Sequence, residues 1–244
     1  MHPRGIAFIG TCSLVGYPLG QERAFPTLVA EAAGNTDRVT LHILQPVAAH
    51  HLARAAAFVD ATSPDVVVLQ LGNFETSLSI ASLIRRQFGR PGLRSEGGYR
   101  TEGIGAYTSN PDLTYQPTSA RRLRVAAKGA LHRLWLHRLV HVHETATNIR
   151  DMAVSLQDAS GLPVLVLDPI PCADPGVAGY RARLRDLLGL EGGSIHHVPL
   201  DPALFHAEGE SAFADAIHLG PRGHQLVAQA VLTAVAELPP VATG

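Results

Sequence analysis

Two short stretches at opposite ends of the chain carry residues that could do covalent chemistry. Near the N-terminus, the segment GTCSLVGY places Cys12 and Ser13 side by side after a short apolar run. Near the C-terminus, Asp215 and His218 lie three residues apart in DAIHLGPRGH. A carboxylate at that spacing can accept a hydrogen bond from one imidazole nitrogen and leave the other nitrogen to act as a base. Each stretch therefore offers part of the machinery of nucleophilic catalysis.

The elements that would position these residues follow a regular alternation. Short runs rich in β-branched residues predict buried parallel strands, and they occur at 6–9, 39–44, 66–71, 164–167 and 194–198. Helical patterns lie between them, at about 22–33, 47–61, 78–88, 178–190 and 222–237. Such alternation is typical of an α/β fold with a parallel sheet and helices on both faces. In such sheets the functional residues gather at the carboxyl ends of the strands.

Composition limits the class of protein. The chain has 244 residues, 46 % of them hydrophobic, and we expect one domain over 1–244. A formal net charge of −1 gives no reason to expect a nucleic-acid partner. The two cysteines predict no disulfide framework, and no apolar run is long enough to cross a membrane. We expect a cytoplasmic protein without a membrane partner.

Three blocks of the sequence resemble the SGNH (GDSL-type) hydrolase family. IAFIGTCSLVGY resembles its first block, SPDVVVLQLGNFE its third and DAIHLGPRGHQLVAQAV its fifth. The resemblance implies a three-layer α/β/α fold with a five-stranded parallel sheet of flavodoxin-like type. It also implies a nucleophile after the first strand, with His218 as the base and Asp215 orienting it. The family's oxyanion hole combines the nucleophile's backbone N–H, a glycine N–H after strand two and an asparagine side chain after strand three.

The first block departs from the family where the nucleophile should stand. Alignment without gaps from Gly10 puts Thr11 on the family's aspartate and Cys12 on its serine, and keeps Gly16 and Tyr17 on the family's Gly-Tyr. A nucleophilic Ser13 would require a one-residue insertion after the strand. We therefore expect Cys12 to be the nucleophile, with Ser13 as the alternative and Thr11 beside the substrate. A third interpretation is that neither residue reacts.

The oxyanion blocks are altered as well. After strand two the chain has no glycine, so the N–H of Val47 or Ala48 would have to substitute. In the third block the gapless alignment puts Phe74 at the family's asparagine, and Asn73 stands one position earlier. We expect Asn73 and the Cys12 N–H to bind the oxyanion, and Phe74 and Glu75 to contact the substrate.

A thiol in a serine hydrolase's position changes the expected substrate. When a thiolate attacks an oxygen ester, the thiolate is expelled again more readily than the alkoxide leaves. When it attacks a thioester, both leaving groups are thiolates and the exchange is nearly balanced. The sequence therefore predicts acyl hydrolysis or transfer from a thioester, such as one of coenzyme A or an acyl carrier protein, with no cofactor and no metal. The alternatives are a serine esterase using Ser13 and a degenerate fold that binds an acylated or glycosylated ligand.

One segment interrupts the alternation. Residues 89–158 lie outside the family match and begin with a long stretch rich in Gly and turn-forming residues. Loops of that length in compact domains are usually lids or binding loops. We expect a helical or lid insertion there, with Tyr107 lining the acyl pocket.

Overall fold

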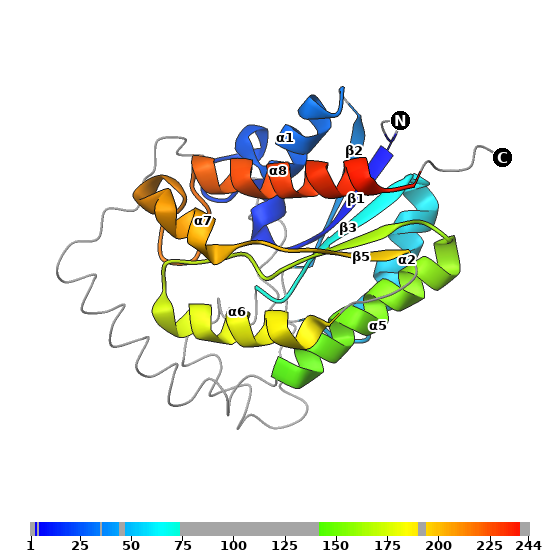
Figure 1. Ribbon diagram of the computed structural model, residues 1–244. Helices are drawn as coiled ribbons and strands as arrows, with labels where there is room; N and C mark the ends of the chain where they lie inside the picture. The colour runs from blue at the N-terminus through cyan, green and yellow to red at the C-terminus, as the bar shows by residue number, and fades with distance from the viewer. Residues whose placement is uncertain are drawn as a thin grey trace.

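Five parallel strands form a single sheet in the order β2-β1-β3-β4-β5 (Figure 1). The computed structural model describes residues 3, 5–34, 36–43, 47–73, 142–189 and 194–239. The strands are β1 (Gly5–Gly10), β2 (Asp37–His42), β3 (Val66–Gln70), β4 (Val164–Leu167) and β5 (Ile195–Val198). All four neighbouring pairs are parallel. The predicted α/β fold with a five-stranded parallel sheet is confirmed.

The three central strands, β1, β3 and β4, have buried side chains on both faces, because helices cover both faces of the sheet. In β1, Ala7 and Ile9 belong to one apolar cluster, while Ile6 and Phe8 belong to the other. All four are fully buried, which explains why the strands read as continuous apolar runs rather than as alternating ones. The two clusters are the two interfaces of a three-layer sandwich.

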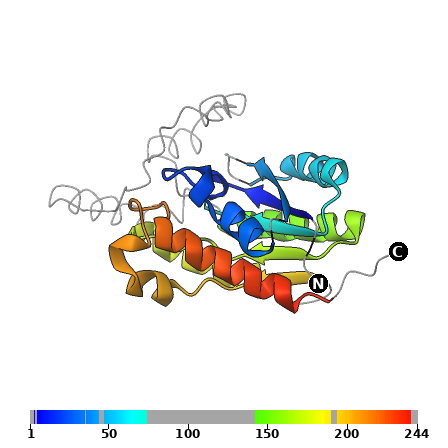
Figure 2. The same cartoon turned by 90° about the horizontal axis from the view of Figure 1, so that it is seen from above.

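The helices divide between the two faces (Figures 1 and 2). One layer contains α2 (His51–Thr62), α5 (Val142–Ser160) and α6 (Pro175–Leu188), and the other contains α1 (Phe25–Ala32) and α8 (Pro221–Glu237). A short helix, α7 (Pro202–Ala207), follows β5 and was not predicted. The helix predicted at about 78–88 lies outside the described residues. Among the helices described, none combines the length and the apolar character needed to cross a membrane.

Helix α5 packs in the core, although its residues 142–158 lie within the range predicted to be an insertion. Ile149, Met152 and Leu156 are each at most 2 % exposed and belong to the core cluster on the α2 and α6 side of the sheet. This part of the predicted insertion therefore forms part of one helical layer, and the rest of it lies outside the described residues.

Close packing of β1 against β3 explains why β1 ends in glycine. A Cβ atom at Gly10 would collide with the carbonyl oxygen of Gln70, the last residue of β3. Gly10 therefore lets the two strands stay paired up to the point where β1 ends and the Cys12 turn begins.

Candidate active site

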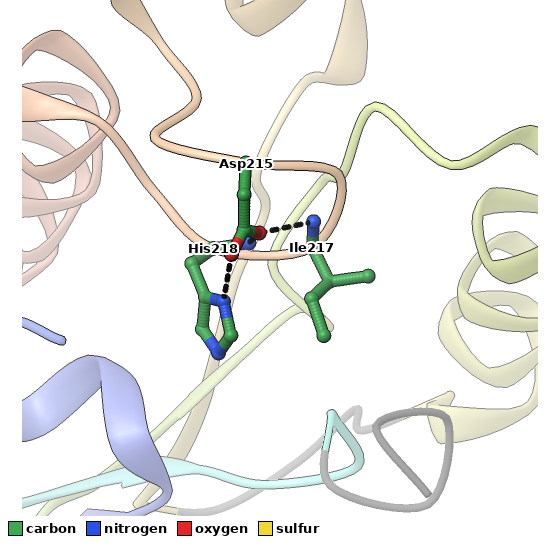
Figure 3. Close-up of polar contacts among 3 residues, drawn as sticks. All are labelled: Asp215, Ile217 and His218. Carbon is green, nitrogen blue, oxygen red and sulfur yellow. Dashed lines mark hydrogen bonds and ion pairs between the residues drawn. The ribbon is translucent and has the colours of Figure 1, made fainter. Parts of the chain in front are cut away.

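The loop before α8 holds the predicted histidine–aspartate pair. Asp215 Oδ2 accepts a hydrogen bond from His218 Nδ1 at 2.8 Å (Figure 3). The other carboxylate oxygen accepts the backbone N–H groups of Ile217 and His218, at 2.8 and 2.9 Å. Both carboxylate oxygens are thus engaged, and the ring of His218 extends away from the loop with Nε2 at its far end (Figure 3).

Backbone hydrogen bonds hold this loop in place. Phe213 and Leu219 form an antiparallel bridge across its base. Ala214 N–H donates to the His218 carbonyl at 3.0 Å, which closes the loop on itself. Asp174 N–H, at the start of α6, donates to the Ala216 carbonyl at 2.9 Å. The histidine is therefore carried by a tight loop that is tied to a neighbouring segment.

The pKa values of Asp215 and His218 are both strongly shifted from their ordinary values. Burial disfavours the imidazolium, but the hydrogen bonds to Asp215 and Cys12 outweigh it and raise the pKa of His218 to about 9. Burial likewise opposes ionisation of Asp215, yet its bonds to His218 and to the backbone lower its pKa to about 2. At neutral pH the pair is therefore an imidazolium and a carboxylate.

The turn that carries the predicted nucleophile, here called the nucleophile turn, follows directly from β1. Cys12 begins a single 3₁₀ turn, Cys12–Val15, in which Leu14 N–H donates to the Thr11 carbonyl at 3.1 Å. Gly16 ends the turn in a left-handed conformation with φ of 69°, a conformation that favours glycine. This tight reversal leaves the Cys12 side chain partly exposed at the carboxyl end of the sheet.

The structure brings Cys12 and His218 together. Burial alone would raise the pKa of the Cys12 thiol, but a hydrogen bond and the positive charge of His218 lower it, as do the charge of Arg181 and a hydrogen bond with Thr11. A thiol with a lowered pKa beside an imidazolium is the activated form of a cysteine nucleophile. Ser13 lies next in the turn, whereas the histidine bonds to Cys12.

Thr11 is placed differently from its predicted role beside the substrate. It is 1 % exposed, and both its N–H and its hydroxyl donate to Gln70 Oε1, at 3.3 and 2.9 Å. Thr11 therefore ties the nucleophile turn to the end of β3. Its one contact with the reacting group is the hydrogen bond with Cys12.

Asn73 lies at the carboxyl end of β3 and is 4 % exposed. Its Oδ1 accepts the Ile170 N–H at 3.1 Å, which fixes the amide so that the donor end, Nδ2, faces the opposite way. Its predicted role in binding an oxyanion requires this orientation, because only Nδ2 can donate. The same Ile170 accepts a hydrogen bond from Arg181 through its carbonyl.

Two further residues at the site were not assigned a role from the sequence. The Tyr17 ring packs edge-to-face against His218, with ring centroids 4.7 Å apart, and limits rotation of the imidazole. Arg181 is a buried cation on α6. Its sequence signal was visible, because an arginine at this position interrupts the apolar stripe formed by Val177, Leu184 and Leu188.

One predicted substitute for the missing glycine is engaged elsewhere. Ala48 N–H donates to His51 Nδ1 at 3.1 Å, so it is not positioned as an oxyanion donor. The predicted substrate contacts Phe74, Glu75 and Tyr107 lie outside the described residues. Within the described ranges, no group of three His, Cys, Asp or Glu side chains could hold a metal ion.

The chain is similar to known proteins in its fold but not closely in its sequence. No protein-family model matches the chain, and no curated protein matches its sequence. Among solved structures it is similar to a member of the lipolytic protein G-D-S-L family from Veillonella parvula DSM 2008, with a TM-score of 0.52 and 13% identity over 96% of this chain and 99% of that one. It is also similar to the acetyl xylan esterase AlAXEase (TM-score 0.53, 16% identity, 95% and 99% covered) and to a GDSL-like lipase from Bacteroides thetaiotaomicron VPI-5482 (0.53, 15%, 96% and 88%).

These likenesses cover nearly the whole of each chain while the sequences have diverged far. The chain therefore has the fold of the SGNH (GDSL-type) hydrolases, as its three sequence blocks implied.

Proposed function

We propose that this protein is an acyl-group hydrolase or acyltransferase that works through a covalent acyl-enzyme on Cys12. The observation that carries the proposal is the contact between Cys12 and His218, whose other ring nitrogen is bonded to ionised Asp215. The similar solved structures include an acetyl xylan esterase and a GDSL-like lipase, which supports acyl chemistry at this end of the sheet.

The reaction uses the residues in turn. The Cys12 thiolate attacks the carbonyl carbon of the substrate, and its electron pair forms the new C–S bond while the carbonyl oxygen becomes an oxyanion. The Cys12 N–H and the Asn73 Nδ2 are the donors we assign to that oxyanion. As the bond to the leaving group breaks, His218 gives its Nε2 proton to the leaving group. His218 then takes a proton from water or another acceptor, which attacks the acyl-cysteine and regenerates the thiolate.

A thioester is the substrate class that this arrangement favours. The lowered pKa of the Cys12 thiol increases the fraction of thiolate, and a thiolate can attack without first losing a proton. The reverse reaction limits its use on oxygen esters, because the thiolate is a better leaving group than an alkoxide. A thioester of coenzyme A or of an acyl carrier protein avoids this limit, since both leaving groups are thiolates.

The test compares Cys12→Ala with Ser13→Ala on a matched pair of substrates, the acetyl thioester of N-acetylcysteamine and the acetyl oxygen ester of N-acetylethanolamine. We expect Cys12→Ala to lose about 10³-fold or more in kcat on the thioester. Ser13→Ala should stay within about fivefold of the natural protein, because a surface-side change beside the nucleophile leaves the triad intact. Intact-mass measurement should show an acetyl adduct that Cys12→Ala abolishes.

Other outcomes identify the alternatives. Full activity in Cys12→Ala together with loss in Ser13→Ala, on the oxygen ester, would establish a serine esterase and contradict the proposal. Binding of the thioester without turnover or adduct in the natural protein would establish a degenerate binding fold.

A further inference from the structure

Arg181 lies in the second turn of α6 among apolar neighbours. Val177, Leu184 and Leu188 on the same face are each at most 1 % exposed, and Arg181 itself is 4 % exposed. Burying a cation costs several kcal/mol unless hydrogen bonds and nearby charge compensate for the lost hydration. The contacts of this guanidinium therefore show what it contributes to the fold.

The guanidinium is held by the loop after β4. Its Nη1 donates to the Ile170 carbonyl at 2.5 Å, which is its one hydrogen-bond acceptor among the described residues. Its Nε is buried and has no acceptor in that part of the chain. Arg181 is therefore held in the interior chiefly by the backbone segment that it anchors.

Ile170 links Arg181 to the oxyanion candidate. Its carbonyl accepts from Arg181, while its N–H donates to Asn73 Oδ1 at 3.1 Å. Ile170 is 1 % exposed and Asn73 is 4 % exposed, so neither hydrogen bond competes with bulk water. A shift of the Ile170 backbone would rotate or release the Asn73 amide.

We propose that Arg181 is a positioning residue of the active site, which holds the Ile170 backbone so that the Asn73 amide presents Nδ2 to the oxyanion. The inference rests on the proposed function for the role of Asn73. The charge of Arg181 adds a second effect, because it helps to lower the pKa of the Cys12 thiol. One buried side chain thus supports both the oxyanion donor and the nucleophile.

The experiment compares Arg181→Gln and Arg181→Lys with Arg183→Gln, a change of an exposed arginine on the same helix. In Arg181→Gln, kcat on the N-acetylcysteamine thioester should fall by about 10- to 100-fold with KM changed less than about threefold, since a transition-state donor is displaced. Iodoacetamide should alkylate Cys12 more slowly below neutral pH, because loss of the Arg181 charge raises the pKa of the thiol and lowers its thiolate fraction. Arg181→Lys keeps the charge and should restore the alkylation profile while kcat stays low. Arg183→Gln should change neither.

A double-mutant cycle and an amide signal complete the test. Arg181→Lys, which keeps the positive charge that acts on Cys12, combined with Asn73→Ala should lose no more kcat than the worse single variant, because both then act through one amide. The side-chain ¹⁵N–¹H signals of Asn73 should move in Arg181→Gln and in Arg181→Lys, and stay unchanged in Arg183→Gln. If Arg181→Gln fails to fold, Arg181→Lys carries the comparison.

Independent, multiplying losses in the cycle would overturn the inference, and so would unmoved Asn73 signals. The amide signals and the alkylation rate do not require turnover. If Cys12→Ala keeps full activity, the proposed function fails, while these two measurements still decide whether Arg181 positions Asn73.

Discussion

Among the described residues, two histidine–aspartate pairs lie at the carboxyl end of the sheet, and one of them contacts the proposed nucleophile, Cys12. Asp215 and His218 are joined at 2.8 Å, and His197 in β5 is joined to Asp168 after β4 at 2.6 Å. Hydrogen bonding to the carboxylate raises the pKa of the histidine in both pairs, against the effect of burial. By distance and by direction of the pKa shift, the pairs are alike.

The difference lies in what each aspartate and ring does besides forming the pair. Asp168 is 1 % exposed, and its second oxygen accepts the Leu200 N–H at 3.0 Å, so it joins two strand ends. Its partner His197 bonds through Nε2 and has a third of its side chain exposed. His218 bonds its aspartate through Nδ1, and this directs Nε2 toward Cys12. A short histidine–carboxylate distance therefore marks a catalytic dyad only when the second ring nitrogen meets a reactive group.

Removing each histidine in turn is the most direct test of whether the two pairs differ in function. His218→Ala should lower kcat by about 10⁴-fold or more, because the proton donor and the charge that stabilises the thiolate disappear together. His197→Ala, the matched control, should keep kcat within about threefold and lose only some stability. The measurement is steady-state turnover of the thioester, with thermal unfolding to confirm the fold. A comparable loss of activity in both variants would contradict the distinction between the pairs.

Replacing the aspartate of each pair should have a smaller effect on kcat than replacing the histidine. The size of that effect also distinguishes a cysteine nucleophile from a serine nucleophile. Asp215→Asn should lower kcat by about 10- to 100-fold and lower the pKa of His218 from about 9, because an amide can still orient the ring but cannot stabilise its charge. In serine triads the corresponding change costs about 10⁴-fold, since the base must start as the correct neutral tautomer. NMR titration of His218 and the thioester kcat measure the two effects.

Asp168→Asn is the control for that change. It should leave kcat within about threefold and reduce stability, because a buried carboxylate that joins Leu200 and His197 is lost. A 10⁴-fold loss in Asp215→Asn would instead favour Ser13 as the nucleophile.

The parts of the fold that could be predicted from sequence are those fixed by local pattern. The three central strands, β1, β3 and β4, were identified because each is a short run of residues buried on both sides. The two edge strands, β2 and β5, were identified from short β-branched runs, although most of their residues are only partly buried. The Asp215–His218 pair could be predicted because the two residues are only three positions apart in one loop, so no distant contact is needed to bring them together. The order of the strands and the pairing of Cys12 with His218 depend on contacts between distant segments, which spacing within one segment does not specify.

The residues that were missed act through such distant contacts. Arg181 contacts Ile170 from another element, and Ile170 in turn contacts Asn73. Nothing beside Arg181 in the chain indicates these partners. Only its place in an apolar helix stripe set it apart. The assignment of Thr11 to the substrate followed the family's alignment, whereas its bond to Gln70 requires β1 to pair with β3. The sequence therefore indicated the proposed reacting groups but not the contacts that hold them in position.

A third histidine, His224, extends the comparison because its hydrogen-bond partner is a backbone N–H instead of a carboxylate. His224 in α8 is fully buried, and its Nδ1 accepts the Phe25 N–H at 3.2 Å. Burial, with the nearby charge of His218, lowers the pKa of His224 to about 3. In the unfolded chain the pKa of His224 is about 6.5. As the pH falls below that value, the unfolded state therefore binds a proton at His224 while the native state stays unprotonated there. The sign is therefore destabilising toward acid and opposite to that of His218, whose contribution is complete below about pH 6.5 and is lost as the pH rises through about 9.

Replacing His224 by asparagine isolates this smallest effect. An asparagine oxygen can accept the Phe25 N–H but cannot titrate, so His224→Asn should remove about 1 kcal/mol of the stability loss between about pH 6.5 and pH 5.5. Urea unfolding across that range measures it, with His206→Asn at an exposed position as the control. An unchanged pH slope in His224→Asn would mean that another group takes up the proton on unfolding. A reduced slope would show that the three histidines differ by their partners: a nucleophile for His218, a strand-joining carboxylate for His197 and a backbone N–H for His224.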